Sequence, residues 1–170
     1  MNIDCVDGYS DPTMDMFHEQ LGPAALRVDT VGQMVKAIEQ QLGKDFLIRR
    51  LRIFGHGIPG AQGLGNSYHL FETALYRQIT LEIGDRAEYA NVLGRLRGKF
   101  EQHGWVELHG CSVGAGANGW NLLKALARLW QAKVAAGVVE QWTTPGFEGA
   151  YYRVAWPDGR VYARHGHIHD

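Results

Sequence analysis

Hydrophobic positions recur with helical spacing in three segments of the chain. In residues 30–42 the apolar side chains fall on one face of a helix with 3.6 residues per turn: Val31, Met34, Val35, Ile38 and Leu42. Thr30 and Gln33 form a capping box at the start of this segment, and Gly43 follows its end. The same spacing predicts helices over residues 87–102 and 119–131.

Short apolar runs lie between these helices, at residues 46–54, 105–109 and 133–139, and they predict buried strands. The alternation of strand and helix predicts an α/β fold, a three-layer arrangement in which helices cover both faces of a mostly parallel sheet. Residues 151–155 and 161–164 flank a Pro-Asp-Gly turn and predict a C-terminal β-hairpin.

The chain has 170 residues, which is the length of one domain. We divide this single domain into four parts by their local patterns. They are an irregular N-terminal arm (1–28), a core (45–140), the hairpin (148–164) and a histidine-rich tail (165–170).

The composition excludes several classes of protein. Apolar residues make up 45% and charged residues 21%, as in ordinary globular domains, and no apolar run is long enough to span a bilayer. A formal net charge of −1 gives no bulk attraction to nucleic acid or anionic membranes, so we expect neither as a partner. The start of the chain lacks the pattern of a signal peptide, and two cysteines suit a reducing compartment, so we expect a cytoplasmic protein.

Two glycine-rich loops follow apolar strands and carry reactive side chains. The first contains Gly55-His56-Gly57, and the second contains His109-Gly110-Cys111. The carboxyl ends of parallel strands meet at one edge of a sheet, which is where ligands bind in open α/β folds. We therefore expect His56 and Cys111 to lie near one another.

Cysteine and histidine together form a common catalytic pair. The thiolate is the reactive form of cysteine, and a neighbouring imidazole lowers the pKa of the thiol. The imidazole can also return a proton to a leaving amine. Adjacent glycines let a substrate approach closely and leave backbone amides to face an oxyanion. The pair of loops therefore predicts acyl transfer, most simply peptide hydrolysis.

The same two blocks resemble the caspase-like fold of cysteine peptidases, the group of caspases, metacaspases, legumains and gingipains. Its members have an apolar strand ending in His-Gly and a second apolar strand ending in a polar–small–Cys sequence. The matching segments here are residues 53–57 and 107–111, and the resemblance extends over residues 45–140, closest to compact bacterial members. It implies a thiol protease, a cysteine endopeptidase with a Cys-His dyad and no cofactor, acting on a protein or peptide substrate.

Carried over to this chain, the resemblance makes Cys111 the nucleophile and His56 the general base and acid. The amides of Gly57 and Cys111 would form the oxyanion hole. His109 takes the position near the floor of the pocket for the side chain before the scissile bond, where relatives often carry Gln, Glu or Asp. A role in which His109 only braces the cysteine loop is an equal alternative.

Three residues after the last core strand, Glu140, Gln141 and Trp142, are candidates to form a wall of the same pocket. The alternative is a solvated strand end with Trp142 packed against the hairpin. Activation by processing, by a partner or by an ion is left open.

Two other functions compete with the peptidase. A catalytically inactive, caspase-like module that binds peptides would have much the same sequence. The run from Gly114 to Gly119 also satisfies G-x-G-x-x-G between a strand and a helix, as in a nucleotide-binding α/β domain. Too few residues follow the glycine run for the second half of such a domain. The nucleotide-binding hypothesis also gives His56 no role.

The tail alternates three histidines, His165, His167 and His169. On an extended strand they share one face, which suits a divalent metal such as Zn²⁺. Terminal tails usually fray, so weak incidental affinity is the favoured interpretation, and we assign no metal site.

Overall fold

The computed structural model describes residues 1–8, 11–64, 87–141 and 151–165. Seven strands of this part of the chain form one sheet in the order β2-β1-β3-β6-β7-β8-β9. Their bounds are β1 (Asn2–Asp7), β2 (Leu26–Val28), β3 (Ile48–Phe54), β6 (Phe100–His109), β7 (Lys133–Gly137), β8 (Tyr151–Ala155) and β9 (Val161–His165). The pairs from β2 to β7 are parallel, and β7-β8 and β8-β9 are antiparallel. The α/β prediction with a mostly parallel sheet is confirmed.

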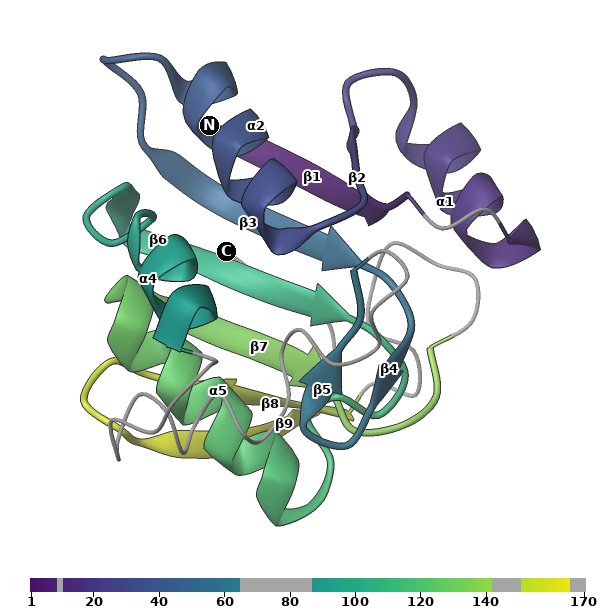
Figure 1. Cartoon of the computed structure of the whole chain (residues 1–170). Helices are drawn as coiled ribbons and strands as arrows, with labels where there is room; N and C mark the ends of the chain where they lie inside the picture. The colour runs from purple at the N-terminus through teal and green to yellow at the C-terminus, as the bar shows by residue number, and fades with distance from the viewer. Residues whose placement is uncertain (9–10, 65–86, 142–150, 166–170) are drawn as a thin grey trace.

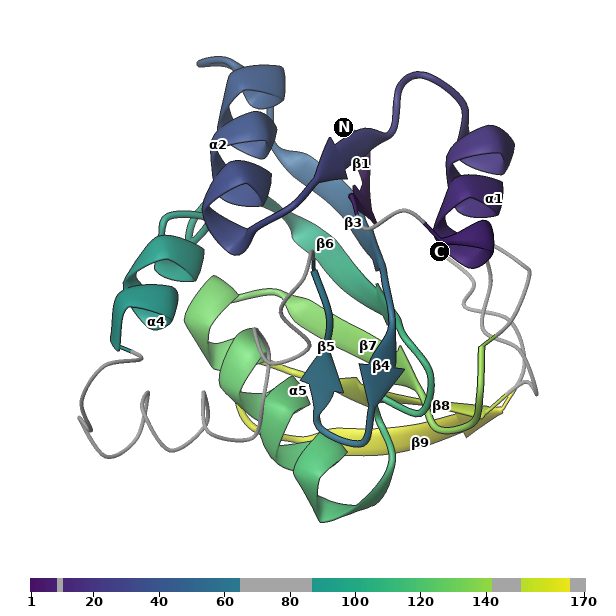
Figure 2. The same ribbon diagram turned by 45° about the vertical axis from the view of Figure 1, so that its right-hand side comes forward.

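Helices cover both faces of the sheet, as predicted (Figures 1 and 2). On one face lie α2 (Val31–Leu42), α4 (Ala87–Gly94) and α5 (Gly116–Trp130), and on the other lies α1 (Pro12–Leu21). The larger core contains side chains of α2, α4 and α5, packed on residues such as Leu51 and Val106 of the central strands. A smaller core joins Met14 and Phe17 of α1 to Val6 and Phe54.

The prediction of an irregular N-terminal arm over residues 1–28 is wrong. This segment contains β1, α1 and β2, and β1 and β2 pair in parallel. Asp11 caps α1, because its Oδ1 accepts the amides of Thr13 and Met14, and Pro12 occupies the first turn. The apolar stripe of this ten-residue helix buries only Met14 and Phe17, so its period is hard to recognise in the sequence.

The helix predicted over residues 30–42 is confirmed as α2. Thr30 Oγ1 accepts the Gln33 amide at 3.1 Å, and the Gln33 side chain accepts the amide of Asp29, one residue before the cap. The helix predicted over residues 87–102 is too long. It ends at Gly94, Gly98 has a φ of 75°, and Phe100 begins β6. A left-handed residue ends the helical path, and the apolar Phe100 belongs to the strand.

The C-terminal hairpin is confirmed by β8 and β9, which pair antiparallel. Tyr151 lies opposite His165 at one end of the pair, and Ala155 lies opposite Val161 at the other. Residues 148–150 of the predicted hairpin and residues 166–170 of the tail lie outside the described residues. A second, short hairpin consists of β4 (Gly57–Ile58) and β5 (Ala61–Gln62), directly after the His56 position. None of the described helices has the length and apolar character needed to cross a membrane.

Candidate active site

The loops that carry His56 and Cys111 contact each other directly. They leave the carboxyl ends of the adjacent parallel strands β3 and β6, where Phe54 pairs with His109. A Cβ atom placed on Gly110 would lie 2.9 Å from Cα of Gly57, and one on Gly57 would lie 2.8 Å from Cα of Gly110. The residue after the histidine and the residue before the cysteine therefore pack backbone against backbone, which only glycine at both positions permits.

The β4–β5 hairpin orients the amide of Gly57. The amide of Gly63 donates to the His56 carbonyl at 2.7 Å, so residues 56 and 63 are a hydrogen-bonded pair. Pairs alternate in an antiparallel ladder, and the next pair, Gly57 and Gln62, is therefore not hydrogen-bonded. The N–H group of Gly57 points away from the hairpin, as an oxyanion-hole amide requires.

The cysteine loop is held by the segment that follows β7. Ser112 has a φ of 55°, and its amide donates to the Val139 carbonyl at 2.8 Å. The amide of Gly114 donates to Gly137 at 2.8 Å. These bonds make residues 112–114 and 137–139 run alongside one another, so that a sharp turn at Ser112 presents Cys111 at the edge of the sheet.

The half-buried Cys111 thiol contacts the backbone of Gln141. Its Sγ lies 3.4 Å from the donating amide nitrogen of Gln141 and 3.3 Å from the carbonyl oxygen of the same residue. The amide stabilises a thiolate, whereas the carbonyl accepts the proton of a thiol. Gln141 itself is 7% exposed, so this backbone is fixed within the protein.

A carboxylate that the sequence did not reveal contacts His56. Asp11 Oδ2 lies 2.5 Å from Nε2 of His56, and the two side chains are 19% and 34% exposed. Burial alone would raise the pKa of Asp11, but hydrogen bonds from His56, Met14 and Thr13 hold it below its usual value. Asp11 is therefore an ionised partner that orients the imidazole. The Asp-Pro pair at a helix start was the available signal, but it indicates a cap and not a site.

His109 lies in the interior of the protein. It is 2% exposed, its ring stacks on Phe54 with centroids 4.6 Å apart, and its Nε2 lies 2.8 Å from Glu107. Burial lowers the pKa of His109, and the hydrogen bond to Glu107 offsets this only in part, so the ring is neutral at pH 7. This placement suits the bracing role beneath the cysteine loop.

A chain of polar contacts extends from the buried His109 along the sheet to Arg50, which is partly exposed. Glu107 is 2% exposed and lies 2.7 Å from the guanidinium of Arg50. The carboxylate therefore connects a cation to the histidine, and the sequence pattern of a buried strand gave no sign of it. Of the other predicted pocket residues, Gln141 contacts Cys111 through its backbone and Glu140 is exposed. Trp142 lies outside the described residues.

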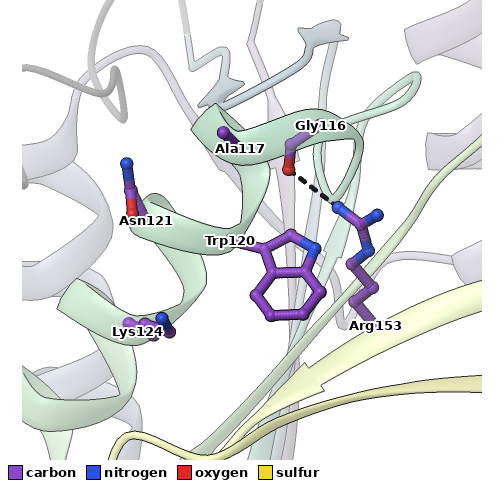
Figure 3. Close-up of a pocket in the computed structure, with 6 residues that line it drawn as sticks. All are labelled: Gly116, Ala117, Trp120, Asn121, Lys124 and Arg153. Carbon is purple, nitrogen blue, oxygen red and sulfur yellow. Dashed lines mark hydrogen bonds between the residues drawn. The ribbon is translucent and has the colours of Figure 1, made fainter.

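An open pocket of about 480 Å³ lies where α5 begins, beyond the cysteine loop (Figure 3). Arg153 from β8 donates to the carbonyls of Gly114 and Gly116, both at 2.8 Å, and its guanidinium lies 5.0 Å from the Trp120 ring. Lys124 Nζ lies 5.6 Å from the same ring. An indole flanked by two cations suits a ligand with a carboxylate or an aromatic group.

Two of the three glycines in the G-x-G-x-x-G run, Gly114 and Gly119, serve internal packing. A Cβ on Gly114 would lie 2.7 Å from the Ala136 carbonyl, and one on Gly119 would lie 2.3 Å from the Gly114 carbonyl carbon. Only Gly116 faces open space. Within the described ranges, no group of three His, Cys, Asp or Glu side chains is arranged to hold a metal ion.

Comparison with known proteins places the chain in a family. Residues 13–141 match the family described as "Domain of unknown function (DUF4347)". No curated protein and no solved structure matches the chain. The family match covers α1 from its second residue, both reactive loops and the segment that contacts Cys111. The chain therefore belongs to the family described as Domain of unknown function (DUF4347).

Proposed function

We propose that this protein is a cysteine endopeptidase in which Cys111 is the nucleophile and His56 the general base and acid. Asp11 orients His56, so the proposed active site is a Cys-His pair whose histidine is hydrogen-bonded to a carboxylate. One observation carries the proposal: the loop that holds a carboxylate-bound histidine packs directly against the loop that holds a half-buried cysteine. The substrate is a protein or peptide, and two unpaired cysteines favour a reducing, cytoplasmic setting.

The proposed reaction begins when Cys111 transfers its proton to His56. With Nε2 bound to Asp11, the proton is exchanged at Nδ1. The thiolate adds to the scissile carbonyl carbon, and the amides of Gly57 and Cys111 stabilise the oxyanion. His56 then gives its proton to the departing amine, which leaves a thioester on Cys111. Water, deprotonated by His56, hydrolyses the thioester and releases the carboxylic acid and the free thiol.

The first experiment measures the rate of alkylation by iodoacetamide against pH, resolved by residue with mass spectrometry. An ordinary thiol is only about 1% thiolate two pH units below its pKa, so fast alkylation of Cys111 at pH 6.5 shows an activated thiol. We expect this rate to collapse in His56→Ala. Cys5 is fully buried, and burial raises the pKa of its thiol, so Cys5 stays unmodified while the protein is folded and reports unfolding.

A peptide-library screen then tests hydrolysis itself. Cys111→Ala and His56→Ala are expected to abolish cleavage while the fold survives. Turnover retained in either variant would overturn the assignment of the dyad. The wild-type chain should cleave at defined bonds, and those bonds identify the preferred side chain.

A catalytically inactive peptide-binding module is the second candidate. The observation that favours it is the contact of Cys111 Sγ with the Gln141 carbonyl, which stabilises the protonated thiol. For this candidate, alkylation of Cys111 is slow at pH 6.5 and insensitive to His56→Ala. The two functions therefore give opposite results in the same assay.

A further inference from the structure

A buried glutamine lies between the two reactive loops. Gln62, on β5, is 0% exposed. A Cβ atom added to Gly55 would lie 3.0 Å from Nε2 of Gln62, and one added to Gly110 would lie 2.9 Å from its Oε1. Gly55 precedes His56 and Gly110 precedes Cys111. The carboxamide thus occupies the space left by the absent side chains of the two glycines that lead into the reactive residues.

Only one end of this carboxamide is hydrogen-bonded within the described part of the chain. Nε2 donates to the carbonyl of Gly63 at 3.3 Å, which fixes the plane of the amide. Oε1 is buried and accepts no hydrogen bond there. A buried acceptor without a partner costs about 1–3 kcal/mol, whereas an apolar side chain of similar shape carries no such penalty. The unpaired oxygen therefore offsets the hydrogen bond to Gly63, and the folded state gains little from a glutamine at this position.

We propose that Gln62 is a positioning residue, which holds the His56 loop and the Cys111 loop at the spacing that proton transfer needs. Its planar amide, oriented by Gly63, lies beside Gly55 of one loop and Gly110 of the other. A flexible apolar side chain fills the same volume without setting that spacing. This inference rests on the proposed peptidase function.

The test combines stability with the pH profile of Cys111 alkylation in Gln62→Met. Met removes the unpaired buried oxygen together with the hydrogen bond to Gly63, and these two effects oppose each other. We therefore expect the melting temperature to be unchanged or higher. Because the loops lose their common spacer, we expect alkylation at pH 6.5 to fall at least tenfold and its midpoint to move to higher pH. Gln62→Leu, of similar volume, is measured beside it in case Met does not fold. A purely structural role for Gln62 predicts the reverse: a lower melting temperature with an unchanged midpoint.

Leu64→Ala is the matched control, because Leu64 lies two residues further along and packs in the main core. It should lower the melting temperature and leave the midpoint in place. If His56→Ala shifts the midpoint and both Gln62 variants leave it unchanged, the inference on Gln62 is overturned and the dyad stands. If His56→Ala itself leaves the midpoint unchanged, the proposed function fails, and the role of Gln62 fails with it.

Discussion

Asp11 and His56 are 45 residues apart in the chain, yet Oδ2 of the first lies 2.5 Å from Nε2 of the second. The other carboxylate oxygen, Oδ1, accepts the amides of Thr13 and Met14 and so caps α1. One carboxylate is therefore held by a helix N-terminus and presented to the histidine. The cap fixes the orientation of this carboxylate independently of the protonation state of His56, so the partner of the imidazole is preorganised.

Asp11→Asn separates these two tasks. The Asn side-chain oxygen can still cap α1, so the melting temperature should stay close to that of the wild type. The negative charge beside His56 is lost, and we expect alkylation of Cys111 at pH 6.5 to fall about tenfold. Asp11→Ala should show the same loss of reactivity and also lose about 1 kcal/mol of stability. A wild-type pH profile in Asp11→Asn would remove Asp11 from the mechanism.

Gly57→Ala tests the contact between the loops. The new Cβ would lie 2.5 Å from Val113 Cγ2 and 2.8 Å from the carbonyl carbon of Gly110, so the loops must move apart. We expect a loss of about 1–3 kcal/mol of stability together with loss of fast alkylation. Gly32→Ala is the control, because Gly32 is exposed on α2 and its nearest neighbour would be 3.9 Å away. It should gain about 0.5–1 kcal/mol. Unchanged reactivity in Gly57→Ala would contradict a direct contact between the two loops.

The neutral, buried state of His109 predicts how stability depends on pH. Burial holds the pKa of His109 below 6.5 in the folded protein. As the pH falls below 6.5, His109 therefore binds a proton more readily in the unfolded chain than in the folded one. The contribution of His109 to the free energy of unfolding should therefore be constant above about pH 6.5 and fall as the pH drops below it. The fall is at most about 1.4 kcal/mol per pH unit. Burial also lowers the pKa of His18, which adds a loss of the same sign.

Urea denaturation between pH 7.5 and 5.5 measures this slope. His109→Gln keeps a donor for Glu107 and does not titrate in this range, so its slope should be smaller than that of the wild type. An equal slope in both proteins would show that His109 takes up a proton in the folded state.

Arg153 should stabilise the cysteine loop from the side of the pocket. It donates to two carbonyls, of Gly114 and Gly116, and its replacement by Ala leaves both without this donor. We expect Arg153→Ala to lose about 1–2 kcal/mol in urea denaturation. Lys124→Ala removes the other cation near Trp120 and should change stability by less than about 0.5 kcal/mol. Equal losses in the two variants would show that contact with the Trp120 ring, and not the loop carbonyls, is what matters.

Elements with a strong local signal were predictable. The 30–42 helix has five apolar residues on one face and a threonine cap, and both appear in the structure. The segment 87–102 has a similar apolar stripe, but Gly98 turns the chain and Phe100 pairs with Ile48 in the sheet. Strand pairing there outweighs helical spacing, because the sheet buries Phe100 just as a helix would.

The candidate site was predictable in part for the same reason. His56 and Cys111 each follow an apolar strand, and strand order together with parallel pairing brings them to one edge. Asp11 and Gln62 have no such signal. Their roles depend on distances between loops, and a helix cap or a short hairpin gives no sequence pattern that measures such a distance.

By itself the sequence determined the class of fold, the strand ends that carry the histidine and the cysteine, and the glycines beside them. Hydrophobic periodicity and strand length are local properties, so they can be read without coordinates. Only the tertiary structure decided that Asp11 reaches His56, that His109 is buried on Phe54, and that Gln62 fills the space between two glycines. Each of these depends on which atoms meet when distant segments pack, and that is set by the closure of the whole sheet and not by any one segment.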